Sequence, residues 1–119
     1  KMLRGEKTVI NGDGKQTRSF CFVDDLVNGL IAMMQSNDDI TGPINLGNPD
    51  EFTMLELAQK VIQQTDSTSS IVYKTLPSDD PRQRKPDITT SNNLLNWAPK
   101  TSLDEGLSTT IKYFFKAIM

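Results

Sequence analysis

Residues 17–35 read TRSFCFVDDLVNGLIAMMQ, and this stretch decides how the chain is expected to fold. Its first part, Thr17 to Val23, is rich in β-branched and aromatic residues and predicts a strand. Asp24 and Asp25 follow, and we interpret both as capping residues because a helix start favours negative charge. Apolar residues then recur at helical spacing to the end of the stretch. The stretch therefore predicts a strand that leads directly into a helix.

Upstream of this stretch, Thr8 to Ile10 is a second β-prone run. It is closed by Asn11-Gly12-Asp13-Gly14, a strong turn signal because Asn and Gly tolerate positive φ. The two strands are therefore expected to be joined by a tight link. Cys21, between two phenylalanines of the second run, is expected to be a buried and inert thiol within a strand.

Downstream, the chain predicts two more short strands, Pro43 to Leu46 and Ile71 to Tyr73. Between them, Thr53 and Glu56 form a capping box, in which each side chain bonds the other residue's backbone N–H. The helix that this box opens is expected to place its apolar residues on an inner side: Leu57, Ala58, Val61 and Ile62.

The segment from Pro77 to Pro86 is proline-rich and is expected to be extended and irregular. Asp87 then serves as the expected N-cap of a short helix that continues to Leu95. A second capping box at Ser102 to Glu105 opens the last helix, whose apolar residues recur on one stripe. The pattern predicts an α+β class, with short strands, three to four helices and no regular βαβ alternation.

Composition excludes several classes of function. The chain has 119 residues, enough for one domain with a modest core, and a net charge of −2, which does not attract nucleic acid or anionic membranes. It has no histidine and one cysteine, so a zinc site and an internal disulfide are not expected. No apolar run is long enough to cross a bilayer, and we expect a cytoplasmic protein. The first residue is not Met, which suggests that the chain begins inside a longer protein.

Arg18 and Arg84 are the candidate functional cations, because each follows or lies in an extended segment beside an expected helix. A planar guanidinium donates two parallel hydrogen bonds to one anion, so two arginines brought together by folding would clamp a diphosphate. Asp87, three residues after Arg84, would accept hydrogen bonds from a sugar diol. These residues point to a nucleotide-sugar site.

Each of these residues also has a plainer interpretation. Arg18 would pair with a surface carboxylate, an interaction that is common and weak. The cluster Arg82 to Lys85 would be a solvated loop; as a nucleic-acid patch it lacks interleaved aromatic residues. Asp87 would act only as a helix cap. The amphipathic helices would equally suit a non-catalytic module that binds a protein partner.

Several motifs resemble, in order and spacing, the C-terminal lobe of extended short-chain dehydrogenases/reductases that act on nucleotide sugars. The resemblance covers nearly the whole chain and is strongest to the UDP-glucuronate decarboxylases, also called UDP-xylose synthases. The motifs are Gly14 to Phe20, Val23 to Leu30, Asn45 to Pro49, Asp79 to Pro81, Arg84 to Asp87, Leu94 to Pro99 and Leu103 to Leu107.

The resemblance implies a fragment, residues 1–119, that binds the UDP-sugar and lacks the N-terminal Rossmann domain. That missing domain would hold NAD and carry the catalytic Tyr-x-x-x-Lys; here Tyr113 is followed four residues later by Ala117. The complete enzyme would oxidise C4 of the sugar, release the C6 carboxylate as carbon dioxide and reduce the 4-keto product. The fragment alone is expected to be inactive, to bind UDP weakly and to self-associate. A 4,6-dehydratase or a 4-epimerase remains an alternative within the family.

The resemblance also assigns roles to single residues. Arg18 and Arg84 match the two arginines that contact the phosphates, and Asp87 matches the acidic residue near the ribose hydroxyls. The backbone of Val9, Ile10, Asn11 and Gly12 matches the stretch that edges the uracil, although the family usually has an aromatic residue where Asn11 stands. Gln16 is a further candidate contact.

Overall fold

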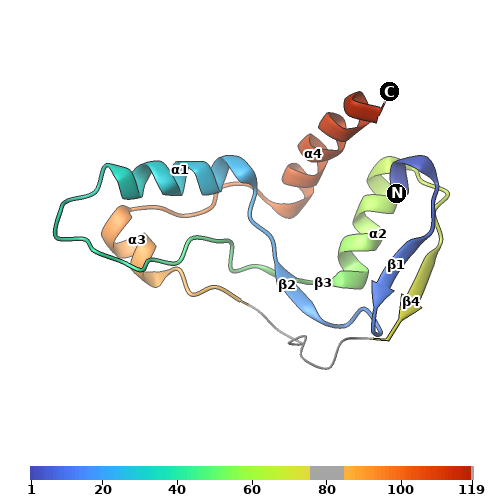
Figure 1. Ribbon diagram of the computed structural model, residues 1–119, viewed down its shortest axis with the longest axis horizontal. Helices are drawn as coiled ribbons and strands as arrows, with labels where there is room; N and C mark the ends of the chain where they lie inside the picture. Colours follow the sequence, from blue (N-terminus) through green and yellow to red (C-terminus); the bar gives the residue numbers. More distant parts are fainter. Residues whose placement is uncertain (76–84, 119) are drawn as a thin grey trace. The chain divides into compact units, whose positions relative to one another are not determined.

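The computed structural model describes residues 1–75 and 85–118, and Figure 1 shows the course of the chain. The predicted α+β class is confirmed. The predictions for residues 77–84, including Arg84, lie outside the described residues. In chain order the elements are η1 (Met2–Arg4), β1 (Thr8–Asn11), β2 (Thr17–Ser19), α1 (Val23–Met34), β3 (Glu51–Thr53), α2 (Met54–Thr65), β4 (Ile71–Lys74), α3 (Thr89–Leu95) and α4 (Leu103–Ile118).

The chain divides into two compact units. Unit 1 takes the described residues of Lys1–Arg18, Phe52–Arg84 and Asp104–Met119, and unit 2 takes Ser19–Glu51 and Lys85–Leu103. Among the described residues, few apolar side chains are buried: Ile10 and Ala58 in unit 1, and Ile88 and Trp97 in unit 2. Each unit therefore has a small core of its own.

In unit 1, β1 and β4 form a parallel pair with Thr8 opposite Ile71 and Asn11 opposite Lys74. The Thr8 N–H donates to the Ser70 carbonyl at 2.8 Å. Parallel strands require a long crossover connection, and α2 lies in the chain between these two. The tight link after β1 is present, but β1 pairs with β4, while β2 pairs with β3.

Helix α2 begins with the predicted capping box, which is confirmed. The Thr53 hydroxyl accepts from the Glu56 N–H, and the Glu56 carboxylate accepts from the Thr53 N–H, both at 3.0 Å. The Lys60 ammonium reaches the Asp104 carboxylate at 3.0 Å and lies 5.8 Å from the centre of the Phe52 ring. These contacts join α2 to the start of α4 within unit 1.

In unit 2, α1 packs against the segment that follows α3. The Trp97 indole N–H donates to the Asp25 carbonyl, and the Thr101 N–H donates to the Asp25 carboxylate, both at 2.9 Å. A Cβ placed on Gly29 would lie 2.9 Å from a Leu46 methyl carbon, so a larger residue here would force Leu46 to shift. Asp25 and Gly29 are accordingly both buried.

Two strands predicted from the sequence differ in the structure. The run from Thr17 to Val23 is a strand only to Ser19, because Val23 already belongs to α1, so Cys21 lies outside any strand and is half-buried. Pro43 to Leu46 forms no strand, since Leu46 packs against Gly29 and the Asn45 amide donates to the Asp87 carbonyl at 3.4 Å. The third strand instead lies at Glu51–Thr53, directly before α2.

The negative charge predicted at the start of α1 is confirmed, but none of the three aspartates predicted as capping residues is the N-cap of its helix. The N-cap of α1 is Phe22, without a side-chain hydrogen bond, and Asp24 and Asp25 lie in the first turn. Asp25 uses its carboxylate for Thr101 instead. The N-cap of α3 is Ile88, because Asp87 stands one residue earlier and bonds Thr89.

Candidate nucleotide-sugar site

The turn after β1 is fixed against the start of α2. Gly12 and Gly14 have φ of 72° and 76°, which glycine adopts without strain. The Gly14 carbonyl accepts from the Leu55 N–H at 3.0 Å, and a Cβ on Gly14 would lie 3.0 Å from the Leu55 Cβ. The Gly12 N–H donates to the Lys74 carbonyl of β4. The stretch predicted to edge the uracil is therefore anchored at its end.

Gln16 is buried behind this turn, with 5% of its surface exposed. Its side-chain Nε2 donates to the Asn11 carbonyl at 2.8 Å, and its backbone carbonyl accepts from the Met54 N–H at 3.0 Å. Its Oε1 has no hydrogen-bond partner among the described residues. Gln16 thus holds the peptide of Asn11 in place from inside unit 1.

The residues of β1 alternate as a half-buried strand does. Ile10 is buried in unit 1, whereas Val9 and Asn11 are exposed. The structure therefore leaves the side chains of Val9 and Asn11 accessible at the position where the uracil is predicted to lie.

Arg18 lies in β2 and is half-buried. Its Nη1 donates to the Thr17 carbonyl at 2.6 Å, so the side chain folds back along its own strand. Val9, Ile10, Asn11, Gly12, Gln16 and Arg18 all belong to unit 1. Because Arg84 lies outside the described residues, the two-arginine clamp stays a prediction.

Asp87 lies in unit 2 and is exposed. Its Oδ1 accepts from the Thr89 N–H at 3.0 Å and from the Thr89 hydroxyl at 2.6 Å. These hydrogen bonds, first from the Thr89 side chain and then from its backbone, lower the pKa of Asp87. The group is therefore held as a carboxylate, and neither of the two bonds occupies Oδ2.

Asp87 also lines a hollow of about 330 Å³ within unit 2, together with Pro49, Lys85, Pro86, Ile88, Thr89 and Asn92. Sequence reasoning did not assign Thr89, Asn45 or Asn92 to the site. An Asp followed two residues later by Thr is the signal for a local turn of this kind, in which the carboxylate bonds the backbone two residues on. The contact from Asn45 joins distant parts of the chain and has no such local signal.

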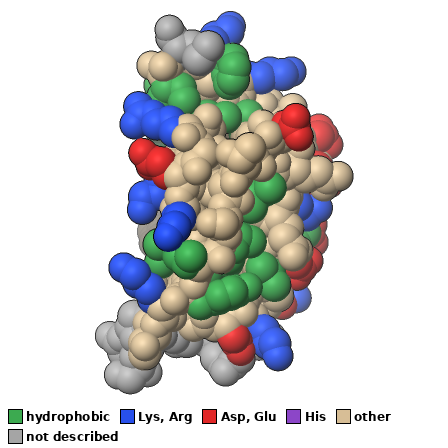
Figure 2. Space-filling view, turned by 90° about the vertical axis from the view of Figure 1, so that its right-hand side faces the viewer, with side chains coloured by type: hydrophobic (Ala, Val, Ile, Leu, Met, Phe, Trp, Pro, Cys, Tyr) green, Lys and Arg blue, Asp and Glu red, His purple; other side chains and the backbone are tan. Residues whose placement is uncertain are grey.

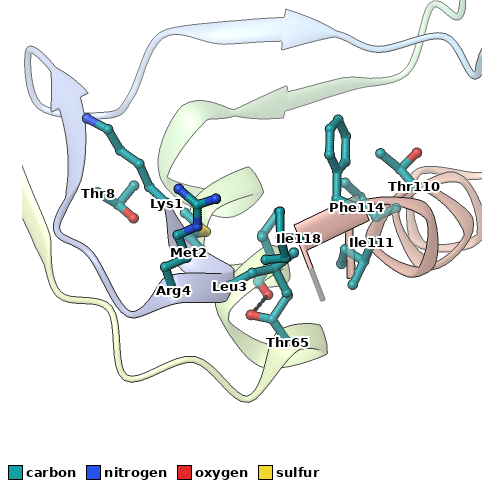
Figure 3. Close-up of a pocket in the computed structure, with 12 residues that line it drawn as sticks. Lys1, Met2, Leu3, Arg4, Thr8, Thr65, Thr110, Ile111, Phe114 and Ile118 are labelled. Carbon is teal, nitrogen blue, oxygen red and sulfur yellow. Dashed lines mark hydrogen bonds between the residues drawn. The ribbon is translucent and has the colours of Figure 1, made fainter. Parts of the chain in front are cut away.

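A larger, more apolar hollow of about 540 Å³ lies in unit 1 (Figure 3). Leu3, Ile111, Phe114 and Ile118 extend into it from η1 and α4, with Lys1 and Arg4 along one side. In a view toward α2, β1 and β4, Figure 2 shows hydrophobic side chains that reach the surface among scattered charges. None of the predicted site residues lines this hollow.

The residues of this chain do not fit an NAD site. A dinucleotide-binding turn places its glycines at the N-terminus of a helix, whereas Gly12 and Gly14 lead into β2. The sequence has no Gly-x-Gly-x-x-Gly and no Tyr-x-x-x-Lys at Tyr113.

Comparison with known proteins defines the class. A family model described as GDP-mannose 4,6 dehydratase matches residues 1–110, and the chain belongs to this family of nucleotide-sugar enzymes. Among its relatives, UDP-glucuronic acid decarboxylase 1 of Arabidopsis thaliana is 50% identical over 98% of this chain and 26% of its own length. The Danio rerio protein of that name is 47% identical over 98% of this chain and 27% of its own length.

Solved structures of related enzymes share the fold. UDP-glucose 4-epimerase of Thermotoga maritima, with UDP-glucose, is 35% identical, with a TM-score of 0.92 over 99% of this chain and 38% of its own. UDP-glucuronic acid 4-epimerase of Bacillus cereus, in complex with UDP-glucuronic acid and NAD, is 27% identical, with a TM-score of 0.90 over 98% and 37%. The resemblance to UDP-glucuronate decarboxylases is confirmed. The chain spans about a quarter of the length of the decarboxylases it matches.

Proposed function

We propose that this chain is the UDP-sugar-binding portion of an NAD-dependent UDP-glucuronate decarboxylase. The observation that carries the proposal is an identity of 45–54% to UDP-glucuronic acid decarboxylases of plants and vertebrates over 88–98% of the chain. The solved 4-epimerases are similar in fold but only 27–35% identical.

The geometry of unit 1 supports a role in holding the nucleotide. The peptide of Asn11 is held from behind by Gln16, and the turn after it is fixed by Leu55 and Lys74. A backbone edge that cannot relax is suited to hydrogen-bond one base, because little ordering remains to be done on binding. Arg18, in the next strand, would turn from the Thr17 carbonyl to the phosphates.

Asp87 would bind the ribose. Its Oδ1 is engaged by Thr89, so Oδ2 is the oxygen that would accept from a ribose hydroxyl. The lowered pKa keeps the group ionised, and hydrogen bonds to a charged acceptor are stronger than those between neutral groups. Arg84 would supply the second phosphate contact.

The remainder of the complete protein would supply the chemistry. When bound there, NAD would accept and return the hydride at C4, while this chain would hold UDP and present the sugar. We propose the N-terminal Rossmann domain of the same protein as the partner that completes the site, and a homodimer as the assembly.

The test is turnover of UDP-glucuronate by the complete protein, with UDP-xylose and carbon dioxide measured as products. Arg18→Ala should raise the KM for UDP-glucuronate about 10- to 100-fold, since a hydrogen bond to a charged group is lost. Arg4→Ala, an arginine outside the predicted site, is the matched control and should leave KM unchanged. Equal KM values for both variants would contradict the role of Arg18.

A 4-epimerase is the second candidate, because the solved structures with the same fold carry that activity in their names. The same assay separates the two. An epimerase would invert C4 and keep the carboxylate, so no carbon dioxide would be released. Release of carbon dioxide in proportion to substrate consumed would exclude it.

A further inference from the structure

Helix α1 carries its large apolar side chains on the outside. Val23, Leu30 and Met34 are 60%, 52% and 84% exposed, and Leu26, Val27 and Ile31 are also exposed. At about 3.6 residues per turn, these six positions fall on one side of the helix. We call this set the α1 face. A globular helix usually turns such a stripe toward its core, so the α1 face is the reverse of the expected arrangement.

The opposite side of α1 packs against the rest of unit 2, so the helix cannot rotate to bury the α1 face there. Asp25 is buried there, with hydrogen bonds of 2.9 Å from the Trp97 indole to its carbonyl and from the Thr101 N–H to its carboxylate. Gly29 lets Leu46 and Trp97 approach so closely that a Cβ would lie 2.9 Å from one and 3.1 Å from the other. Small and polar residues thus hold the helix, and its apolar residues remain for another surface.

Charge around the α1 face indicates what covers it. Helix α1 contains no Lys or Arg, while Asp24 lies exposed near its start and Asp38 and Asp39 follow its end. A nucleic acid or an anionic membrane would be repelled by such a rim. A second copy of the same face would bring like charges together, since it offers no cation to pair with them.

We propose that the α1 face docks on an apolar surface with a basic rim in the remaining part of the same protein. The decarboxylases that this chain matches are about four times longer than the matched region, which covers 26% and 27% of two of them. Most of the surface available to cover α1 therefore lies outside this chain. The identity of that remainder rests on the proposed function, whereas the exposure of the α1 face does not.

Cysteine labelling tests this docking. In a Cys21→Ser background, Leu30→Cys places a thiol in the α1 face, and Asn28→Cys places one on an exposed flank of the same helix. Each variant is reacted with a maleimide in the dilute 119-residue chain and in the complete protein, after circular dichroism has shown unchanged helix content. Leu30→Cys should react at least roughly tenfold more slowly in the complete protein, while Asn28→Cys should react equally in both.

Three results would overturn the docking. Equal rates for Leu30→Cys in both proteins would mean that the α1 face stays open. Slow labelling in the dilute chain itself would mean that the chain covers its own face. Protection that grows with the concentration of the isolated chain and is no stronger in the complete protein would assign the face to a second copy.

The result is independent of catalysis. Protection of Leu30→Cys in a protein that does not convert UDP-glucuronate would support the docking and reject the proposed function. Conversion of UDP-glucuronate by a protein whose α1 face labels freely would support the proposed function and reject the docking.

Discussion

At the scale of single residues, Gln16 is the side chain whose role the structure changes most. It is an amide that is 5% exposed and donates to the Asn11 carbonyl, and its Oε1 has no partner among the described residues. A neutral amide suits this position because it brings one donor to a buried acceptor without bringing a charge.

Gln16→Glu should therefore destabilise the chain by about 1–3 kcal/mol at neutral pH, because the donor is lost and a carboxylate is buried against a carbonyl. Burial raises the pKa of an introduced carboxyl. Below that pKa its O–H can donate to the Asn11 carbonyl, so the loss of stability relative to the unsubstituted chain, the deficit, should shrink as the pH falls. Urea unfolding at neutral and acidic pH measures this, with Gln63→Glu, at an exposed position of α2, as the control. A deficit that is the same for both variants would contradict the role given to Gln16.

Residue type alone could not distinguish these roles. Gln16 was predicted as a ligand contact, and nothing in its neighbours signals that its side chain turns inward to Asn11. Asp25 was predicted as a cap, yet it bonds Thr101, a residue far along the chain. By contrast, the bond from Thr89 to Asp87 is local, and the Asp-x-Thr pattern contains it.

At the scale of elements, the start of α2 has the clearest energetics. The Thr53 hydroxyl satisfies the Glu56 N–H, so Thr53→Ala should cost about 1 kcal/mol of stability. Urea unfolding measures the loss. Gln59→Ala, at an exposed position of the same helix, is the control and should change stability little. An equal effect of the two substitutions would show that the cap contributes nothing.

The same capping box gives a pH dependence with a defined sign. Hydrogen bonds from Thr53, first from its backbone, lower the pKa of Glu56. A lowered pKa in the folded state contributes stability above the pKa of the unfolded chain, and that contribution is lost as the pH falls through the folded value. Glu56→Gln should therefore destabilise the chain near neutral pH and have little effect in acid.

Local sequence patterns located the helices better than the strand pairs. The capping box before α2 lies within four residues, and the pattern found it. The pairing of β1 with β4 joins Thr8 to Ile71, and a short-range pattern cannot specify a partner at that separation. For α1 the spacing predicted a helix, but the direction of its apolar face depends on Leu46 and Trp97, which pack on the other side.

At the scale of the whole molecule, the described residues divide into two units, and the assignment of residues 1–119 to one nucleotide-sugar-binding lobe stays a prediction. Neither unit is a continuous stretch of the chain, so no linker or change of composition marks the division. The boundary falls within β2, between Arg18 and Ser19, and within β3, between Glu51 and Phe52. Such a division depends on which contacts form in space, and a composition scan does not detect it.

Two small cores should unfold in separable steps. The single tryptophan, Trp97, is buried in unit 2, whereas both tyrosines, Tyr73 and Tyr113, lie in unit 1. Urea unfolding followed by Trp97 emission should therefore report unit 2, and tyrosine absorbance should report unit 1. Asp25→Ala removes the carboxylate that accepts from the Thr101 N–H in unit 2, and should lower the midpoint of the Trp97 transition more than that of the tyrosine transition.

Thr53→Ala in unit 1 is the matched variant and should lower the tyrosine midpoint more than the Trp97 midpoint. Coincident transitions that both substitutions shift equally would mean that the two units unfold as one cooperative body, because coincidence of independent probes is the mark of two-state unfolding. Separate shifts would instead show that each unit is stabilised by its own contacts. In that case the docking of the α1 face in the complete protein would add stability first to unit 2, whose helix carries it.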